Sequence, residues 1–164
     1  MGYRLFSGLA GLLLAAALAM PGEAATLGAN PFDQLNGDWK GGGTIIPSKG
    51  EPKKVTCETT YKTTGGNVAQ TLRCTGNDYE VNTTLKLTYK NGKIKGSWNE
   101  TVYDANGAVA GTAKDDTIHA RITGDKFSGR MSIKTSAAGH TINILQLDEQ
   151  SGTYRLATSL SFHH

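Results

Sequence analysis

The chain has few of the residues that mark a redox, metal-binding or membrane-spanning protein. It contains two cysteines among 164 residues, with no Cys-X-X-Cys motif and no accompanying His/Cys cluster. After residue 20, no run approaches the ~20 apolar residues that a transmembrane helix needs. The net charge is +3, the longest basic run is Lys53-Lys54, and few aromatic residues alternate with the lysines. We therefore expect no metal, no cofactor, no nucleic-acid partner and no membrane span.

Catalytic motifs are also missing. No Gly-X-Ser-X-Gly elbow occurs, and Gly41-Gly42-Gly43 precedes a predicted strand, so it is not a phosphate-binding loop that opens a helix. Close approach of Trp39 or of a neighbouring strand explains these glycines more simply. Glu100 and Asp116 are the only inward carboxylate candidates, and nothing fixes their separation. We expect no role for the histidines, His119 (outward), His140 (at a strand start), and His163 and His164 (a frayed tail). The sequence thus predicts that the protein is not an enzyme.

The N-terminus has the order of a secretory signal peptide. A charged start, Met1–Arg4, is followed by the apolar run Leu5–Met20 and by small residues up to Ala25. We predict a signal peptide over residues 1–24, an extended segment over 25–37 and one domain over 38–162. The mature protein should be an exported, soluble monomer in the periplasm or outside the cell of a bacterium.

Turn signals recur between runs rich in Val, Ile, Thr and Tyr. They are Gly65-Gly66, Gly76-Asn77, Asn91-Gly92, Asn106-Gly107 and Gly124-Asp125. Such pairs supply the positive φ that tight hairpins require, so each one fixes the register of its two strands. With Gly65-Gly66 as a two-residue loop, Cys57 lies opposite Cys74 as a non-hydrogen-bonded pair. We predict a structural disulfide, which would contribute on the order of 3 kcal/mol.

The other turns predict one inner face that is mostly apolar. The expected neighbours are Leu72 with Val81, Tyr89 with Ile94, Leu85 with Trp98, Val102 with Ala110, and Ile118 with Met131. The opposite face collects polar residues such as Lys54, Thr56, Glu58, Lys62, Lys86, Lys95, His119, Arg121, Arg130 and Lys134. This alternation is typical of an antiparallel meander.

The pattern predicts an all-β fold, an up-and-down meander of about nine strands that closes into a barrel. Closure is favoured over a two-sheet sandwich because successive hairpins need no crossover and leave no exposed edges. Lys114 and Asp116 fall in inward phase, which suggests a bulge before Ile118. Leu145 and Leu147 fall in outward phase. We expect a segment with Leu27, Phe32 and Leu35 to cover these two leucines, and a partner-binding patch is the alternative.

Gly37-Asp38-Trp39, at the start of the first predicted strand, resembles the Gly-X-Trp motif of the calycin superfamily, which includes lipocalins and avidins. The resemblance implies a closed barrel with Trp39 packed across one end. The chain is more similar to small exported bacterial proteins of unassigned function. That likeness rests on Leu35–Ile45, Thr59-Thr60-Tyr61, Leu72-Arg73-Cys74 and Gly96-Ser97-Trp98-Asn99-Glu100. It implies an exported, disulfide-bonded β-domain and no particular activity.

One polar row crosses the predicted inner face. The registers place Tyr61, Gln70, Thr83, Glu100 and Thr112 side by side, with Trp98 in the next row. Apolar walls with a few convergent polar groups are typical of a small-ligand site. A self-satisfied buried network is the alternative, and we favour it at roughly two to one because buried polar groups usually satisfy one another.

Three functions remain open on the sequence. The first is an exported carrier of a small amphiphilic molecule held near Trp98 and Glu100. The second is a protein-interaction module of the cell envelope, for example a barrel that inhibits a protease, acting through its loops or through Leu145 and Leu147. The third, a hydrolase, is not required by any feature.

Overall fold

The computed structural model describes residues 30–164, so the predicted signal peptide and Leu27 lie outside the described residues. A short 3-10 helix, η1 (Pro31–Leu35), is followed by ten strands. They are β1 (Gly37–Ile45), β2 (Lys53–Thr64), β3 (Asn67–Thr75), β4 (Glu80–Lys90), β5 (Lys93–Glu100), β6 (Ala105–Lys114), β7 (Thr117–Gly124), β8 (Gly129–Ser136), β9 (Gly139–Leu147) and β10 (Tyr154–His163).

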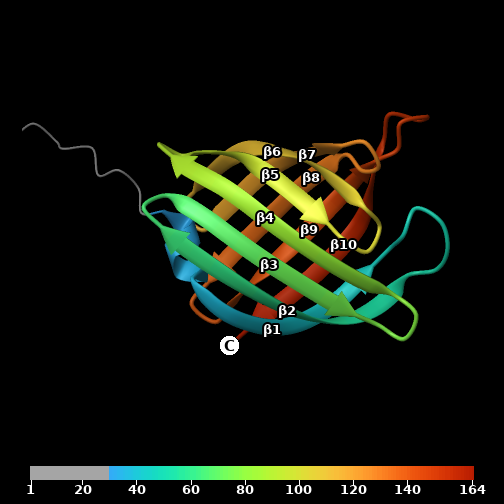
Figure 1. Ribbon diagram of the computed structural model, residues 1–164, viewed down its shortest axis with the longest axis horizontal. Coiled ribbons are helices and arrows are strands. Elements are labelled where there is room, and N and C mark those ends of the chain that lie inside the picture. The colour runs from blue at the N-terminus through green and yellow to red at the C-terminus, as the bar shows by residue number, and fades with distance from the viewer. Residues whose placement is uncertain (1–29) are drawn as a thin grey trace, which may run out of the picture.

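The strands form one closed antiparallel barrel in which each strand pairs with its sequence neighbours and β1 pairs with β10 (Figure 1). The all-β class and the closed meander are thus confirmed, and the sandwich is excluded. There are ten strands rather than about nine. Within the described residues, no helix is long and apolar enough to cross a membrane.

Glycines on β1 allow the barrel to close. A Cβ atom on Gly41 would lie 1.9 Å from the carbonyl oxygen of Ser161, and one on Gly43 would lie 2.0 Å from that of Ser159. Both oxygens belong to β10, so only glycine lets the first and last strands approach this closely. The expectation that a neighbouring strand explains the glycine run is confirmed.

Helix η1 closes one end of the barrel. Asn30 caps it by accepting a hydrogen bond from the backbone N–H of Phe32, and both Phe32 and Leu35 are fully buried. Trp39 is also buried and donates its indole N–H to the carbonyl oxygen of Leu35 at 2.7 Å. Trp39 therefore packs against η1 at this end of the barrel.

Two predicted registers are confirmed. Gly65-Gly66 joins β2 to β3 so that Thr64 pairs with Asn67 and Cys57 with Cys74, and the two cysteines form a disulfide. Asn91-Gly92 pairs Leu85 with Trp98, as predicted. Both turns carry the positive φ values expected of them.

Two other registers were wrong by two residues. The β3–β4 connection spans residues 76–79, because Gly76 donates its N–H to the carbonyl oxygen of Tyr79. Leu72 therefore pairs with Thr83, and Gln70 pairs with Leu85. The β7–β8 connection also has four residues, 125–128, which pairs Ile118 with Ile133. Because side chains alternate between the two faces of a strand, a register shift of two residues leaves every side chain on its predicted face. The burial pattern of these strands therefore still agrees with the prediction.

The predicted pairing of β5 with β6 was wrong by an odd number of residues, so the side chains of β6 lie on the opposite faces from those predicted. The turn lies at residues 101–104, and Asn106-Gly107 belongs to β6 opposite Asn99 and Trp98. Gly107 serves close approach, since a Cβ there would lie 1.8 Å from the carbonyl oxygen of Thr123. As a result, Thr112 and Lys114 face outward, and the bulge expected before Ile118 is not needed.

The predicted cover over Leu145 and Leu147 was wrong for the residues that the structure describes. Phe32 and Leu35 are buried at the barrel end, whereas Leu145 stays exposed on the outer face of β9. Leu147 is partly exposed on the same face. The alternative, an exposed patch, is taken up below.

Candidate functional site

The two ends of the barrel are built differently. At the end closed by η1, the connections are two residues long, namely 65–66, 91–92, 115–116 and 137–138. At the opposite end they are longer, at residues 46–52, 76–79, 101–104, 125–128 and 148–153. Figure 1 shows η1 on the left and the longer loops on the right. The loop-bearing end is the one that a ligand would approach.

The inward side chains near η1 are, for the most part, more deeply buried than those in the loop half. Near η1, the exposed fraction is 3% or less for Tyr61, Ile94, Ile118, Ile133 and Phe162, whereas Gln70 exposes 8%. In the loop half, the exposed fraction is 6–9% for Ile45, Val55, Leu85, Trp98, Ala105, Ala120, Ile122 and Met131, whereas Cys57 and Cys74 are fully buried. Among the partly buried side chains, Leu72, Val81 and Ile144 lie in the loop half and Tyr89 lies near η1. We call the interior of the loop half the cup; its wall is mostly apolar and is covered less completely than the core near η1.

Trp98 forms part of the cup wall. Its indole N–H donates to the carbonyl oxygen of Thr123 at 3.4 Å, and its ring meets Phe127 edge-on, with centroids 6.2 Å apart. The buried disulfide of Cys57 and Cys74 forms another part of the inner face. Trp98 lies where the sequence predicted a wall residue.

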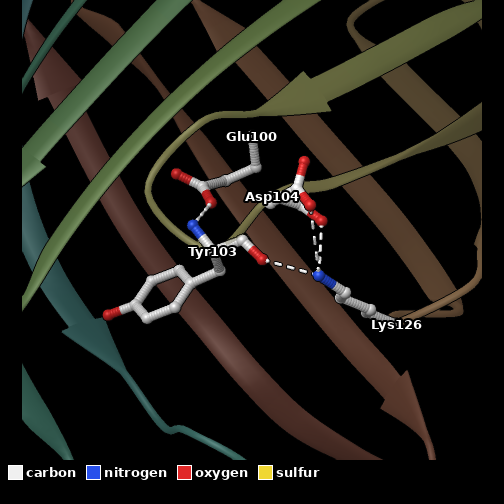
Figure 2. A network of polar contacts seen from close by, with 4 residues as sticks. All are labelled: Glu100, Tyr103, Asp104 and Lys126. Atoms are coloured by element: carbon white, nitrogen blue, oxygen red, sulfur yellow. Dashed lines mark hydrogen bonds and ion pairs between the residues drawn. The ribbon is translucent and has the colours of Figure 1, made fainter.

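Glu100 is buried and its carboxylate is satisfied by backbone donors. One oxygen accepts from the N–H groups of Asn82 at 2.9 Å and Val102 at 3.0 Å, and the other accepts from Tyr103 at 2.6 Å. Figure 2 shows the bond to Tyr103 at the turn that follows β5. Glu100 therefore holds the 101–104 turn, which agrees with the self-satisfied network rather than with a free ligand contact.

The same turn is fastened to the next loop by Lys126. Its ammonium donates to the carbonyl oxygens of Tyr103 at 3.1 Å and Asp104 at 2.7 Å, and it lies 3.7 Å from the Asp104 carboxylate (Figure 2). The Tyr103 ring lies against Tyr79 from the β3–β4 loop, with centroids 5.6 Å apart. Burial raises the pKa of Tyr79 to about 12, so its hydroxyl stays protonated. These contacts form a fixed aromatic rim at the mouth of the cup.

A second polar network lies in the half of the barrel closed by η1. Gln70 donates from its amide nitrogen to Thr59 Oγ1 at 3.1 Å and to the Tyr61 hydroxyl at 2.9 Å. Thr59 in turn donates to the carbonyl oxygen of Thr71. Burial raises the pKa of Tyr61 above its ordinary value, so this hydroxyl is a neutral donor. It points to Nε2 of His140 at 3.4 Å.

His140 is held in the interior by this hydrogen bond and by aromatic contacts. The Tyr61 hydroxyl and Nε2 share a hydrogen bond whose direction depends on the tautomer of the imidazole, and Nδ1 is buried with no partner among the described residues. The imidazole stacks on Phe162, and Trp39 meets it edge-on. Burial, with a smaller contribution from His164, lowers the pKa of His140 to about 4.

The predicted polar row is thus split into separate groups. Tyr61 and Gln70 are neighbours as predicted, and Thr83 pairs with Glu100. Gln70 and Thr83 are not opposite each other, and Thr112 lies on the outer face. The ligand role assigned to these residues stays a prediction, and Thr83, Trp98 and Glu100 belong to the loop half.

Sequence reasoning missed the inward position of His140, although its alternation with Ile142 and Ile144 could have shown it. It also assigned His164 to a frayed tail, whereas this ring stacks on Trp39 with centroids 3.6 Å apart. Within residues 30–164, no three His, Cys, Asp or Glu side chains are grouped to hold a metal ion.

Comparison with known proteins supports the fold. No family model matches the chain, and no curated protein matches it. The crystal structure of Rv2717c from M. tuberculosis is similar, with a TM-score of 0.67, 12% identity, and coverage of 84% of this chain and 98% of that one. The S-type phycobiliprotein lyase CPES from Guillardia theta has a TM-score of 0.53 and 14% identity, over 80% and 88% of the two chains. The chain therefore shares its barrel fold with both.

Proposed function

We propose that this chain is an exported, non-enzymatic binding protein that takes a small amphiphilic molecule into the loop half of its barrel. The observation that carries the proposal is the difference in exposure between the two halves of the interior. A barrel that served only as a rigid scaffold would gain stability by filling both halves to the same density. Here most inward side chains of the loop half are less completely covered than those of the half closed by η1.

The chemistry of the cup favours an amphiphile. The partly buried inner side chains are Leu72, Val81 and Ile144, which suit an apolar tail. The mouth carries the hydroxyls of Tyr79 and Tyr103, which can donate to a polar head group. The packed core around Ile118 and Tyr61 limits the depth to which a tail can enter, so the ligand should be small.

The disulfide is compatible with export, because such bonds persist in oxidising compartments. The similar fold of a protein that is named as a phycobiliprotein lyase adds that barrels of this shape can act on other molecules. Neither observation identifies the ligand of this chain.

The test compares two variants that add the same ring on opposite faces of β3. Leu72→Trp fills the cup, because Leu72 faces inward, whereas Thr71→Trp places the indole on the exposed outer face. The fluorescent amphiphile 1-anilinonaphthalene-8-sulfonate is titrated into each variant and into the natural protein. We expect Leu72→Trp to bind the probe at least about tenfold more weakly and Thr71→Trp to bind it as the natural protein does.

Native mass spectrometry of protein purified from an exporting host provides the second readout. We expect an extra mass on the natural protein and on Thr71→Trp that is absent from Leu72→Trp. Equal probe affinity in all three proteins would overturn the proposal, provided that circular dichroism shows the same fold in each.

A further inference from the structure

A row of directly paired, exposed residues crosses the outer wall of the barrel. From β4 to β10 the register joins Thr88, Lys95, Ala110, Arg121, Arg130, Leu145 and Leu156, each opposite the next. All of them are exposed. The row begins with polar and basic residues and ends with two leucines.

Positive charge gathers on this side of the molecule. The outward positions from the middle of β4 to the end of β8 carry Lys86, Lys90, Lys93, Lys95, Lys114, Arg121, Arg130 and Lys134, and none of them carries a carboxylate. The ion pairs found among the described residues use Lys40, Lys53 and Lys126, which lie outside this set. Asp115 and Asp116 belong to the turn at the η1 end of this wall. The net charge of +3 is spread along the sequence but concentrated in space.

Two of the cation pairs oppose the fold. Lys90 pairs with Lys93, and Arg121 pairs with Arg130, each directly across two strands. Like charges directly opposite one another destabilise a sheet, so these two cross-strand pairings do not themselves add stability. Their arrangement favours an anionic partner that the structure does not contain.

Two exposed leucines lie next to the cations, and they indicate that the anionic partner also offers an apolar surface. Leu145 exposes 37% of its surface and Leu156 exposes 43%, and the two are directly paired. Beside them the guanidinium of Arg130 lies 4.1 Å from the centroid of the Tyr154 ring. We call Arg121, Arg130, Leu145 and Leu156 the basic-leucine face.

We propose that the basic-leucine face docks on an anionic phospholipid bilayer. The arginines would meet lipid phosphates, and the leucines would enter the boundary between head groups and acyl chains. A nucleic acid would use the cations but would gain nothing from exposed aliphatic side chains. A bilayer is fluid and adapts to a convex barrel wall, whereas a folded protein would need a concave surface of matching curvature. This docking is independent of the ligand proposed for the cup.

The test measures co-flotation of the purified protein with vesicles. One set contains phosphatidylcholine alone, and the other contains about 30% phosphatidylglycerol, each at about 0.05 M and 0.3 M salt. We expect binding to the anionic vesicles only, and weaker binding at the higher salt concentration.

Arg121→Gln/Arg130→Gln should reduce the affinity for anionic vesicles roughly 25-fold. Because it removes a like-charge pair, which offsets the loss of the Arg130–Tyr154 contact, it should change the melting temperature little. Leu145→Ser/Leu156→Ser should also weaken binding. The matched control is Lys54→Gln/Lys62→Gln on β2, which removes the same charge from the opposite side of the barrel and should bind as the natural protein does.

The proposal would be overturned by equal binding to neutral and anionic vesicles, by an equal loss of affinity in the β2 control, or by no binding to anionic vesicles at the lower salt concentration. Displacement from vesicles by a short DNA duplex at equal phosphate concentration would also overturn it, in favour of a nucleic-acid partner.

Discussion

Replacing Glu100 with Gln should unfold the mouth of the cup rather than merely weaken ligand binding. The carboxylate accepts hydrogen bonds from the backbone N–H groups of Asn82, Val102 and Tyr103, and no side chain shares it. A Gln side chain has one acceptor oxygen. If that oxygen keeps the bonds to Asn82 and Val102, the amide nitrogen faces the N–H of Tyr103, and two donors then oppose each other.

The magnitude follows from these bonds. A hydrogen bond to a charged acceptor contributes about 1.5–3 kcal/mol, and a buried donor left unsatisfied costs a similar amount. The lost bond and the weakening of the other two together give about 3 kcal/mol of destabilisation. For a domain of this size, that corresponds to a fall of about 10 °C in melting temperature.

The assay is urea unfolding followed by the fluorescence of the two buried tryptophans, Trp39 and Trp98, with Glu58→Gln as the matched control. Glu58 lies 3.5 Å from Lys40 in an exposed ion pair, so its replacement should cost less than about 0.5 kcal/mol. A Glu100→Gln variant within about 1 kcal/mol of this control would refute the assignment of Glu100 to the turn. That result would return Glu100 to the list of candidate ligand contacts.

Two further predictions concern stability. Because the pKa of His140 is lowered to about 4 in the folded protein, from its ordinary 6.5, the unfolded chain binds a proton first as the pH falls. The free energy of unfolding should therefore fall between about pH 6.5 and pH 4, and this slope should be shallower in His140→Gln. Reduction of the Cys57–Cys74 bond, which spans 17 residues, should cost about 3 kcal/mol in urea unfolding, and Cys57→Ser/Cys74→Ser should not respond to the reductant. An unchanged midpoint on reduction of the natural protein would contradict this estimate.

The fold could be predicted because its signals are local and repeated. Gly65-Gly66 and Asn91-Gly92 adopt positive φ, and each pair sits between strands with alternating polar and apolar residues. The turn position and the alternation therefore predict the same inner face. The η1-end turns are short enough to leave a single register. The loop end is different, because four-residue connections such as 76–79 admit two registers of the same face. Local sequence does not distinguish between them.

The site could be predicted only in part, for a related reason. Asn106-Gly107 has the propensity of a hairpin turn. In the structure, however, the buried carboxylate of Glu100 accepts hydrogen bonds from the N–H groups of Val102 and Tyr103, and these bonds stabilise a turn that lies earlier in the sequence, at residues 101–104. This competition is tertiary, and the odd shift moved Thr112 from the inner face to the outer face. This misplaced turn and the slipped β3–β4 connection together created a polar row that the barrel does not contain.

The two halves of the barrel are stabilised by different physical means, and this explains why the polar residues of the loop half look like ligand contacts. Near η1, aromatic and aliphatic packing around Phe32, Leu35 and Ile118 fixes the strands. A cup that stays accessible must do without such packing at its mouth. There the Glu100 carboxylate and the Lys126 ammonium tie the loops together through backbone groups. A charged side chain at the mouth of the barrel can either hold a loop or bind a ligand, and its position in the sequence does not distinguish the two roles. Its hydrogen-bond partners do, because Glu100 and Lys126 bond to backbone groups of the loops.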